Sequence, residues 1–182
     1  YPVYVLLKGA DLYTHKESKT YSRDDFHQYP KIYRSRFLPY TRCTDILMNG
    51  IYWSEHAPRL FELSDIDESF SIETIADITD DLNGSVPINL GDQSIEDPVY
   101  GVDRQTLKKT APYLSSSIDV MAIGNLPNEL PRDASRYFGE QLIKFVIEDL
   151  IKGGNEIIDR ATLVKAGDIT PHYQYMKAYA GL

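Results

Sequence analysis

The chain has 182 residues, 42% of them hydrophobic and 12% aromatic, which is enough for one folded domain with a substantial core. Nineteen Lys plus Arg against 27 Asp plus Glu give a formal charge of −8, which argues against the basic stripe of a nucleic-acid-binding protein. The sequence has no run of about 18 apolar residues that could span a membrane. We therefore expect neither a nucleic-acid nor a membrane partner.

The single cysteine, Cys43, excludes an internal disulfide and a cysteine-based metal cage, and it fits a reducing compartment. The N-terminus lacks the basic region, apolar stretch and cleavage site of a secretory signal. We therefore expect a cytoplasmic protein. The histidines show no i, i+4 pair, so the sequence predicts no metal site; they are His15, His27, His56 and His172.

Short strand-like runs alternate with longer helical ones along the chain, which is typical of an α/β protein. The β-branched and aromatic run 2–9 predicts a strand. Aromatic residues then recur every three or four positions, which predicts one face of a helix broken or restarted near Pro30; they are Phe26, Tyr29, Tyr33 and Phe37.

Three further segments, 45–53, 73–79 and 117–124, are predicted to form neighbouring parallel strands. The first is almost continuously apolar, as expected of a strand covered on both faces of its sheet. Each segment ends in a polar loop. These loops contain Asn49-Gly50, the stretch from Asp77 to Gly84, and the stretch from Gly124 to Pro127.

The stretch 89–112 is polar and aperiodic, and it predicts a long loop with a short hairpin around PVYGVD. The apolar residues between Pro131 and Ile151 have helical spacing, and Gly153-Gly154 supplies a stop. Shorter helices are predicted for 155–165 and about 171–179.

Several catalytic signatures are absent from the sequence. It has no G-x-G-x-x-G dinucleotide loop, no P-loop and no G-x-S-x-G nucleophile elbow. Asp77, Asp80 and Asp81 have two interpretations: they can hold Mg²⁺ or act as acid and base, or they can serve as loop caps and turn formers. Because open α/β sheets bind ligands at the carboxyl ends of their strands, the three polar strand ends predict a ligand crevice.

Three runs resemble successive blocks of the saccharopine-handling dehydrogenases: YTRCTDILMNGIYWSEHAPRLF, IADITDDLNGSVPI and IGNLPNELPRDASRYFGEQL. That family comprises the lysine-forming saccharopine dehydrogenase and the lysine–oxoglutarate reductase domain, and it is similar to alanine dehydrogenase and the transhydrogenase NAD domain. The resemblance extends from YPKIYRSRFLPYT to DITPHYQYMKAY, so it covers most of the chain.

The resemblance implies an NAD- or NADP-dependent oxidoreductase with a small amino-acid substrate and two Rossmann-like domains. Its glycine-rich loop and acid–base residues lie upstream of the part that matches here. Residues 1–130 then form the carboxyl part of the dinucleotide-binding domain, with a Rossmann-like parallel sheet. Residues 131–182 form helices that return to the partner domain. The upstream half of the enzyme is therefore an expected partner, and a homo-oligomer is possible.

The resemblance also implies roles for single residues. Asn49, Gly50, Ile51 and Tyr52 correspond to a strand end that runs beside the cofactor, although Tyr52 has core packing as an equal alternative. Asp77 and Asp81 occupy a D-x-x-x-D loop. The first acid is assigned to the cofactor and the second to the reacting centre, where it can orient a substrate amine.

The loop of Asn125, Leu126 and Pro127 matches an N-[LM]-P motif that approaches the nicotinamide, and its prolines are expected to stiffen it. Arg132 is a candidate for binding a substrate carboxylate, with a solvent-exposed role as the alternative. Gly124 departs from the family, whose members commonly carry Asp there, and this makes saccharopine itself a less certain substrate than the family.

Three functions remain open at this point: a saccharopine dehydrogenase, a related alanine- or ornithine-type dehydrogenase, and a non-catalytic relative that acts as an interaction domain. The choice between NAD and NADP depends on residues upstream.

Overall fold

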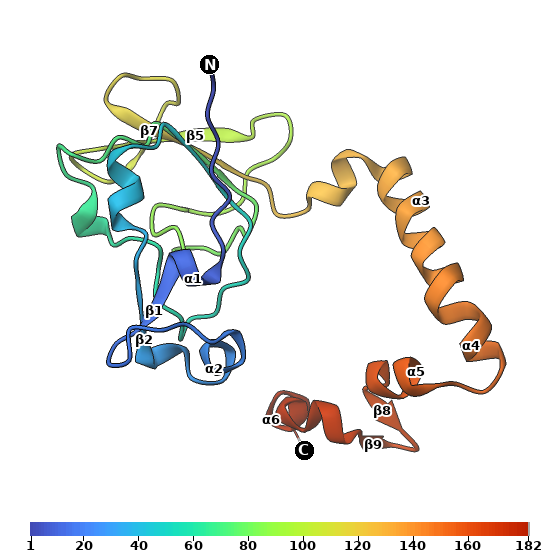
Figure 1. The fold of residues 1–182 in the computed structure, drawn as a ribbon. Helices are drawn as coiled ribbons and strands as arrows, with labels where there is room; N and C mark the ends of the chain where they lie inside the picture. The colour runs from blue at the N-terminus through green and yellow to red at the C-terminus, as the bar shows by residue number, and fades with distance from the viewer. Residues whose placement is uncertain (182) are drawn as a thin grey trace. The chain divides into compact units, whose positions relative to one another are not determined.

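The computed structural model describes residues 1–181, and the chain divides into two compact units, Tyr1–Leu126 and Pro127–Leu182. Figure 1 colours the chain from its N-terminus to its C-terminus. The predicted boundary between residues 130 and 131 concerns contacts with a partner domain and stays a prediction. Each unit is described by itself.

The first unit is built on a five-stranded sheet with the order β3-β4-β7-β5-β6. Its strands are β3 Ile46–Asn49, β4 Thr74–Asp77, β5 Val99–Asp103, β6 Lys109–Thr110 and β7 Ser117–Ala122. Strands β3, β4 and β7 are parallel neighbours, as the sequence predicted. The expected hairpin is β5–β6, and β5 also pairs antiparallel with β7, so the sheet is mixed and α/β in class.

One face of this sheet carries the core of the unit. Leu47, Ile75, Val120 and Tyr100 are paired in register across four strands, and the last three are buried. On the opposite face of β3, Ile46 is 64% exposed and Met48 72% exposed. The expectation that this strand is covered on both faces is therefore wrong for the described structure, because apolar composition does not reveal which face has a covering layer.

The beginning of the chain does not form the predicted strand at 2–9. Residues 1–8 have no regular structure, and α1 Gly9–Leu12 follows them (Figure 1). The side chains of Tyr1, Val3, Tyr4 and Val5 are exposed. A strand needs a neighbour for its backbone N–H and C=O groups, and none pairs with this segment within the described residues.

An aromatic cluster holds the next elements together. The strands β1 Tyr13–His15 and β2 Tyr33–Ser35 pair antiparallel, and α2 Arg23–Gln28 lies between them in sequence. The rings of Tyr13 and Phe26 stack with centroids 4.5 Å apart, and Tyr33 meets Phe26 edge-on at 5.2 Å.

The predicted aromatic helix is interrupted near Pro30, as expected, but it does not restart as an α-helix. A 3₁₀ turn at Pro30–Ile32 leads into β2. Phe26, Tyr33 and Phe37 are buried in the core, whereas Tyr29 is exposed. The spacing thus identified three core residues and missed the change from helix to strand.

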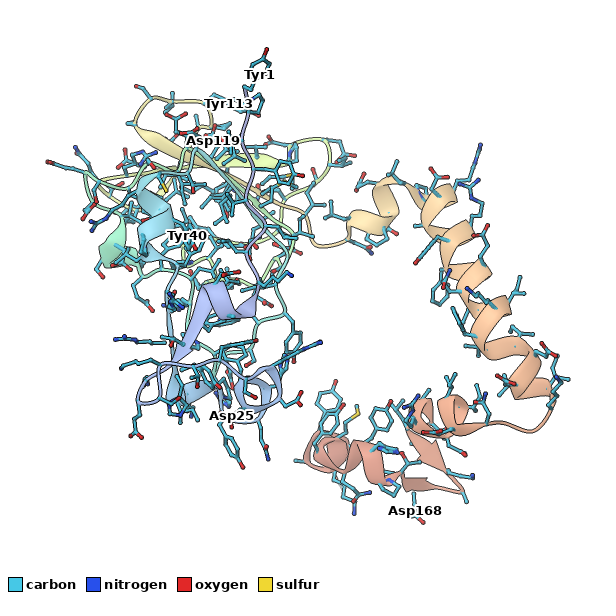
Figure 2. The ribbon with its side chains drawn as sticks, viewed as in Figure 1. Tyr1, Asp25, Tyr40, Tyr113, Asp119 and Asp168 are labelled. Atoms are coloured by element: carbon cyan, nitrogen blue, oxygen red, sulfur yellow. The ribbon has the colours of Figure 1, made fainter. Side chains whose placement is uncertain are left out.

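The segment between β6 and β7 is fixed by side chains of β7. Figure 2 labels Tyr113 and Asp119, and the backbone N–H of Tyr113 donates to Asp119 Oδ1 at 2.8 Å. In addition, the Arg104 guanidinium donates to the carbonyls of Phe70 and Ile72 at 2.8 and 2.7 Å. These bonds satisfy backbone groups of loops that have no strand partner.

The second unit begins with the helix predicted for 131–151. It consists of α3 Pro131–Leu142, a π-helical turn Ile143–Ile147 and α4 Glu148–Ile151. The remaining elements are α5 Glu156–Ala161, β8 Val164–Lys165, β9 Asp168–Ile169, a 3₁₀ helix Pro171–Met176 and α6 Lys177–Ala180. Most large apolar side chains of the long helix, including Phe138 and Leu150, are exposed, whereas Leu142 and Val146 are half-buried.

No helix among residues 1–181 is long and apolar enough to cross a membrane.

Substitution of Ile75 by Ala should lower the free energy of unfolding of the chain by about 2–5 kcal/mol, because it opens a cavity in the sheet core. Ile46→Ala on β3 is the matched control, and it should change stability by less than about 0.5 kcal/mol because that side chain is exposed. Urea unfolding measures both values. Equal losses in the two variants would contradict the assignment of the core face.

Candidate functional site

The carboxyl ends of β3 and β4 meet at one edge of the sheet. The last residues of the two strands, Asn49 and Asp77, are register partners, and both side chains are buried. The Asn49 Nδ2 group donates to Asp77 Oδ1 at 2.7 Å and to Ser85 Oγ at 2.9 Å. Two polar strand ends predicted from the sequence therefore form one hydrogen-bonded network.

A second amide completes the surroundings of the Asp77 carboxylate. Asn89 Nδ2 donates to Asp77 Oδ2 at 2.8 Å and to Asp80 Oδ1 at 3.1 Å. Each oxygen of Asp77 thus accepts a bond from an amide group, which is how a buried carboxylate is stabilised without a cation. One acceptor of the network, Asn49 Oδ1, is buried with no partner among the described residues.

The loop after β4 has a defined shape. The Asn49 carbonyl accepts from the backbone N–H of Ile78 at 2.7 Å, and Thr79 Oγ1 donates to the Ile51 carbonyl at 2.7 Å. Asp80 has φ +54°, in the left-handed region that Asp and Asn tolerate better than most residues. The two loops therefore run side by side past the strand ends.

Gly84 is required in this loop by close packing. A Cβ at this position would lie 2.4 Å from Asp81 Cβ and 2.7 Å from the Asp81 carbonyl oxygen. Any larger residue would push Asp81 out of place, so Asp81 can keep its position only because residue 84 has no side chain.

A cleft of about 330 Å³ lies between the loops that follow β3 and β4. It is lined by Gly50, Ile51, Tyr52, Trp53, Ile78, Thr79 and Asp81. Four of the predicted site residues, Gly50, Ile51, Tyr52 and Asp81, are in this lining. Tyr52 is 78% exposed, which argues against core packing as its role.

The two acids of the β4 loop are easier to protonate than free aspartate. Burial, followed by the charge of Asp77, raises the pKa of Asp81. For Asp80 burial is again the main cause of a raised pKa, and the charges of Asp92 and Asp77 add to it against the hydrogen bond from Asn89. Such acids can hold a proton at less acidic pH than exposed ones.

The third strand end lies against the same acids. A Cβ on Gly124, just after β7, would meet Asp92 Oδ2 at 2.5 Å and Asp80 Oδ2 at 3.3 Å. Asn125 follows directly and is exposed. The structure therefore brings the chain at Gly124 next to the Asp80 loop, and Asn125 begins the loop that leaves this edge.

The predicted N-L-P loop is a short 3₁₀ helix, Leu126–Glu129, rather than an irregular loop. Pro127 belongs to the second unit, as does Arg132, which is exposed in the first turn of α3. Their roles at the site stay predictions. Among residues 1–181, no group of three or more His, Cys, Asp or Glu side chains is arranged to hold a metal ion.

Sequence reasoning missed Ser85, Asn89 and Asp92. Ser85 and Asn89 flank a short apolar run and are buried with it, at 1% and 0% exposure. Polar residues that bracket a buried run are a usable signal, because a buried polar group needs partners. Nothing in the sequence around Asp92 distinguishes it from the other acids of its loop.

This arrangement defines a class of protein. Three parallel strands end at one edge in polar loops, and a cleft lies between the loops that follow β3 and β4. This is the Rossmann-like α/β design, in which ligands bind at the carboxyl ends of the strands. The predicted fold class is therefore confirmed.

The chain is similar in sequence to several curated proteins. The chain is 28% identical to alpha-aminoadipic semialdehyde synthase, mitochondrial, of Mus musculus over 195 aligned positions, which cover 89% of this chain and 20% of that protein. It is also 28% identical to the Rattus norvegicus protein of that name, over the same shares. The Arabidopsis thaliana alpha-aminoadipic semialdehyde synthase is 27% identical, over 97% of this chain and 18% of that protein.

The chain thus spans about a fifth of the length of the curated relatives it matches. No family model matches it. The resemblance found in the sequence is confirmed in this form: the chain matches one portion of these synthases.

Substitution of Asn49 by Ala should lower the free energy of unfolding by about 1–3 kcal/mol, because Asp77 Oδ1 then loses its amide donor while it stays buried. Asn128→Ala, at an exposed position, is the control and should be neutral. Chemical denaturation of the two variants checks this prediction. An unchanged stability of the Asn49 variant would show that water replaces the amide at no cost.

The stability change caused by Asp80→Asn should depend on pH. A raised pKa means that folding disfavours the ionised form, so the wild type loses stability as the pH rises above the ordinary value of 3.8. Asparagine removes the charge, keeps an acceptor for Asn89 and tolerates a positive φ. The variant should therefore be more stable than the wild type at pH 7, by a margin that shrinks toward pH 4.

The stability change caused by Asp67→Asn should have the opposite sign, so this variant should be less stable than the wild type at pH 7. Hydrogen bonds from Ser69 lower the pKa of Asp67, so its charge favours the folded state above pH 3.8, and this advantage is lost as the pH falls. Unfolding curves from about pH 2.5 to about pH 7.5 test both variants, because the transition of Asp67 lies below pH 3.8. Parallel curves for the wild type and the Asp80 variant would contradict the raised pKa.

Proposed function

We propose that the chain forms the carboxyl part of the dinucleotide domain of an NAD- or NADP-dependent oxidoreductase that interconverts lysine plus 2-oxoglutarate and saccharopine. The observation that carries this proposal is the match of nearly the whole chain to alpha-aminoadipic semialdehyde synthases, which are bifunctional lysine–oxoglutarate reductase/saccharopine dehydrogenases. The cleft at the strand ends supports it from the geometry.

The residues around the cleft fit a planar cofactor ring. Gly50 has no atom within 4 Å of the place where a Cβ would stand, so that side of the cleft is open. Tyr52 and Trp53 supply aromatic faces, and the Asp81 carboxyl lies in the same lining. When bound, a nicotinamide accepts or donates the hydride.

The chain's own residues would then have three tasks. Gly50 and Ile51 provide a backbone surface that a ring can approach closely. Asp81, with its raised pKa, holds or releases a proton near a substrate amine. The Asn125 side chain offers both a donor and an acceptor to a carboxamide.

The proposal includes the partners and the location. The upstream half of the enzyme would supply the phosphate-binding loop, and Arg132 would bind a substrate carboxylate. Two animal relatives bear the word mitochondrial in their names, whereas the Arabidopsis protein does not. The cytoplasmic location and a homo-oligomeric state stay predictions, and fractionation and light scattering would test them.

The activity test uses the full-length protein that carries this chain. With lysine, 2-oxoglutarate and NADPH or NADH, the nucleotide should be oxidised, and saccharopine should appear by mass spectrometry. Oxidation with pyruvate and ammonia instead would favour an alanine-type enzyme. Loss of nucleotide oxidation with every substrate would leave the non-catalytic interpretation.

Residues 1–182 alone should bind NAD(H) weakly or not at all and should have no dehydrogenase activity. Much of the affinity for a dinucleotide comes from its pyrophosphate, which is held by a glycine-rich turn at a helix N-terminus, and this sequence has no such motif. Calorimetric titration of NADH and NADPH measures this. Micromolar binding to the isolated chain would mean that the cofactor site has been misplaced.

In the full-length protein, Asn125→Ala should weaken nucleotide binding by about 1–3 kcal/mol, because the carboxamide would lose its partner. Asn128→Ala is the matched control, since it is an exposed asparagine three residues further along the chain. Equal affinity of the Asn125 variant and the control would exclude the proposed contact.

A further inference from the structure

A second cleft lies beside the first. Its volume of about 490 Å³ is within the range of small-molecule sites, about 300–1,000 Å³. Trp53 lines both clefts, and Asp81 of the first is followed directly in the chain by Leu82 of the second. The two clefts are therefore neighbours that share one wall. The lining of the second combines apolar side chains with charged ones, among them Trp53, Pro58, Leu82, Glu55, Arg59 and Glu62.

The guanidinium of Arg59 is held in this lining and still has free donors. Its Nη1 donates to Glu62 Oε2 at 3.2 Å, and its Nη2 donates to the Asn83 carbonyl at 3.0 Å. The other N–H groups of the guanidinium have no partner among residues 1–181. The pair of Arg59 and Glu62 is partly exposed and joined by one hydrogen bond, so it contributes little to stability. A ligand carboxylate that accepts two bonds would bind the guanidinium more strongly.

The segments that carry the lining are fixed to each other. The backbone N–H of Leu60 donates to the Ser85 carbonyl at 2.9 Å, next to the contact of Arg59 with Asn83. The indole N–H of Trp53 donates to the Pro58 carbonyl at 3.3 Å, which holds the aromatic ring at the boundary of the two clefts. The second cleft thus presents a positioned guanidinium close to an aromatic wall.

The lining carries charges of both signs. Glu62 is paired with Arg59, whereas the exposed carboxylate of Glu55 has only His56 beside it, at 3.7 Å. An anion without a positive group would meet the two carboxylates, and a cation without a negative group would meet the guanidinium. A zwitterion matches both signs. An α-amino acid has this character, and an aliphatic side chain on it would pack against the apolar part of the wall.

We infer that the second cleft holds the α-amino acid head of the substrate. Arg59 binds its α-carboxylate, Glu55 pairs with its α-ammonium group, and Trp53 and Leu82 pack against its aliphatic chain. Arg59 is then a specificity-determining residue that selects an α-amino acid over a simple amine.

This arrangement directs the reacting end of the substrate to the first cleft. Lysine carries its reacting ε-amino group at the far end of an aliphatic chain from its α-carbon. With the α-carbon beside Arg59, the chain passes Trp53, and the ε-amino group reaches the cleft that contains Asp81. The inference therefore rests on the proposed function, and it adds the residues that hold the non-reacting end of lysine.

The kinetic test uses the full-length protein with lysine, 2-oxoglutarate and NADPH or NADH. Arg59→Gln should raise the KM for lysine at least tenfold, because the α-carboxylate loses its guanidinium. The KM values for 2-oxoglutarate and the nucleotide should stay within twofold. Arg34→Gln is the matched control, since Arg34 is an exposed arginine of β2 with no hydrogen-bond partner for its side chain among residues 1–181. It should leave all three KM values within twofold.

Two competitors of lysine distinguish a contact with the substrate from a change in loop shape. Norleucine has the α-amino acid head and an aliphatic chain but no ε-amino group, and cadaverine is lysine without its carboxylate. Arg59→Gln should raise the inhibition constant of norleucine at least tenfold and leave that of cadaverine within twofold. Glu55→Gln should raise both constants about threefold, because both compounds keep the amine with which Glu55 pairs.

Three kinetic results would overturn the inference: an increase of the KM for lysine below tenfold in Arg59→Gln, an equal weakening of both competitors by this variant, or unchanged constants in Glu55→Gln. If the wild type turns over no lysine, the proposed function fails, and calorimetric titration of norleucine into the full-length protein then decides the role of the second cleft. Binding that Arg59→Gln weakens at least tenfold relative to Arg34→Gln supports it. No binding to the wild type, or a smaller difference between the variants, refutes it.

Discussion

The buried carboxylate of Asp77 is the interaction on which the carboxyl edge of the sheet depends. Desolvation of a carboxylate is costly unless each oxygen finds a donor, and here the amides of Asn49 and Asn89 supply one to each. These amides come from β3 and from the loop that precedes β5, so one charge holds together three segments that are far apart in sequence. The shape of the edge follows from this requirement.

The same network determines what surrounds the cleft. Because Asn89 also bonds to Asp80, the loop after β4 is fixed on the side that faces Gly124. Because the Asn49 carbonyl accepts from Ile78, the loops after β3 and β4 run together and enclose the cleft that contains Asp81. A change in any of these amides would therefore move acids that do not touch it.

The sequence was most informative where a local pattern of apolar and polar residues indicates one type of secondary structure. The three apolar runs with polar ends predicted parallel strands and a common polar edge, and the helical spacing after Pro131 predicted the long helix. The strand-end argument pointed to the polar loops at Asn49-Gly50 and after Asp77, whereas Ile51, Tyr52 and the separate roles of Asp77 and Asp81 came from the family resemblance and stay predictions. A carboxylate that is paired only through tertiary contacts, such as Asp77 with Asn89, has no comparable local signal.

The predictions of secondary structure and of site residues failed where the structure depends on contacts with segments distant in the sequence. The run 2–9 has the composition of a strand, but no strand pairs with it in the described chain. Phe26, Tyr33 and Phe37 have helical spacing, yet a helix, a strand and a loop carry them to the same core. Asp92 was missed because its place beside Gly124 is set by anchors at Asn89 and Gln93, and such anchors are visible only in three dimensions.

The exposed face and free side of β3 have a consequence for how this polypeptide behaves in solution. The strand lies at the end of the strand order, so one side of its backbone has no partner strand within the described residues, and Ile46, Leu47 and Met48 provide no charge or proline to prevent pairing with another strand. Natural sheets protect such edges against association. An unprotected edge favours self-association when this polypeptide is produced alone, so its solubility will depend on whatever strand or helix covers β3.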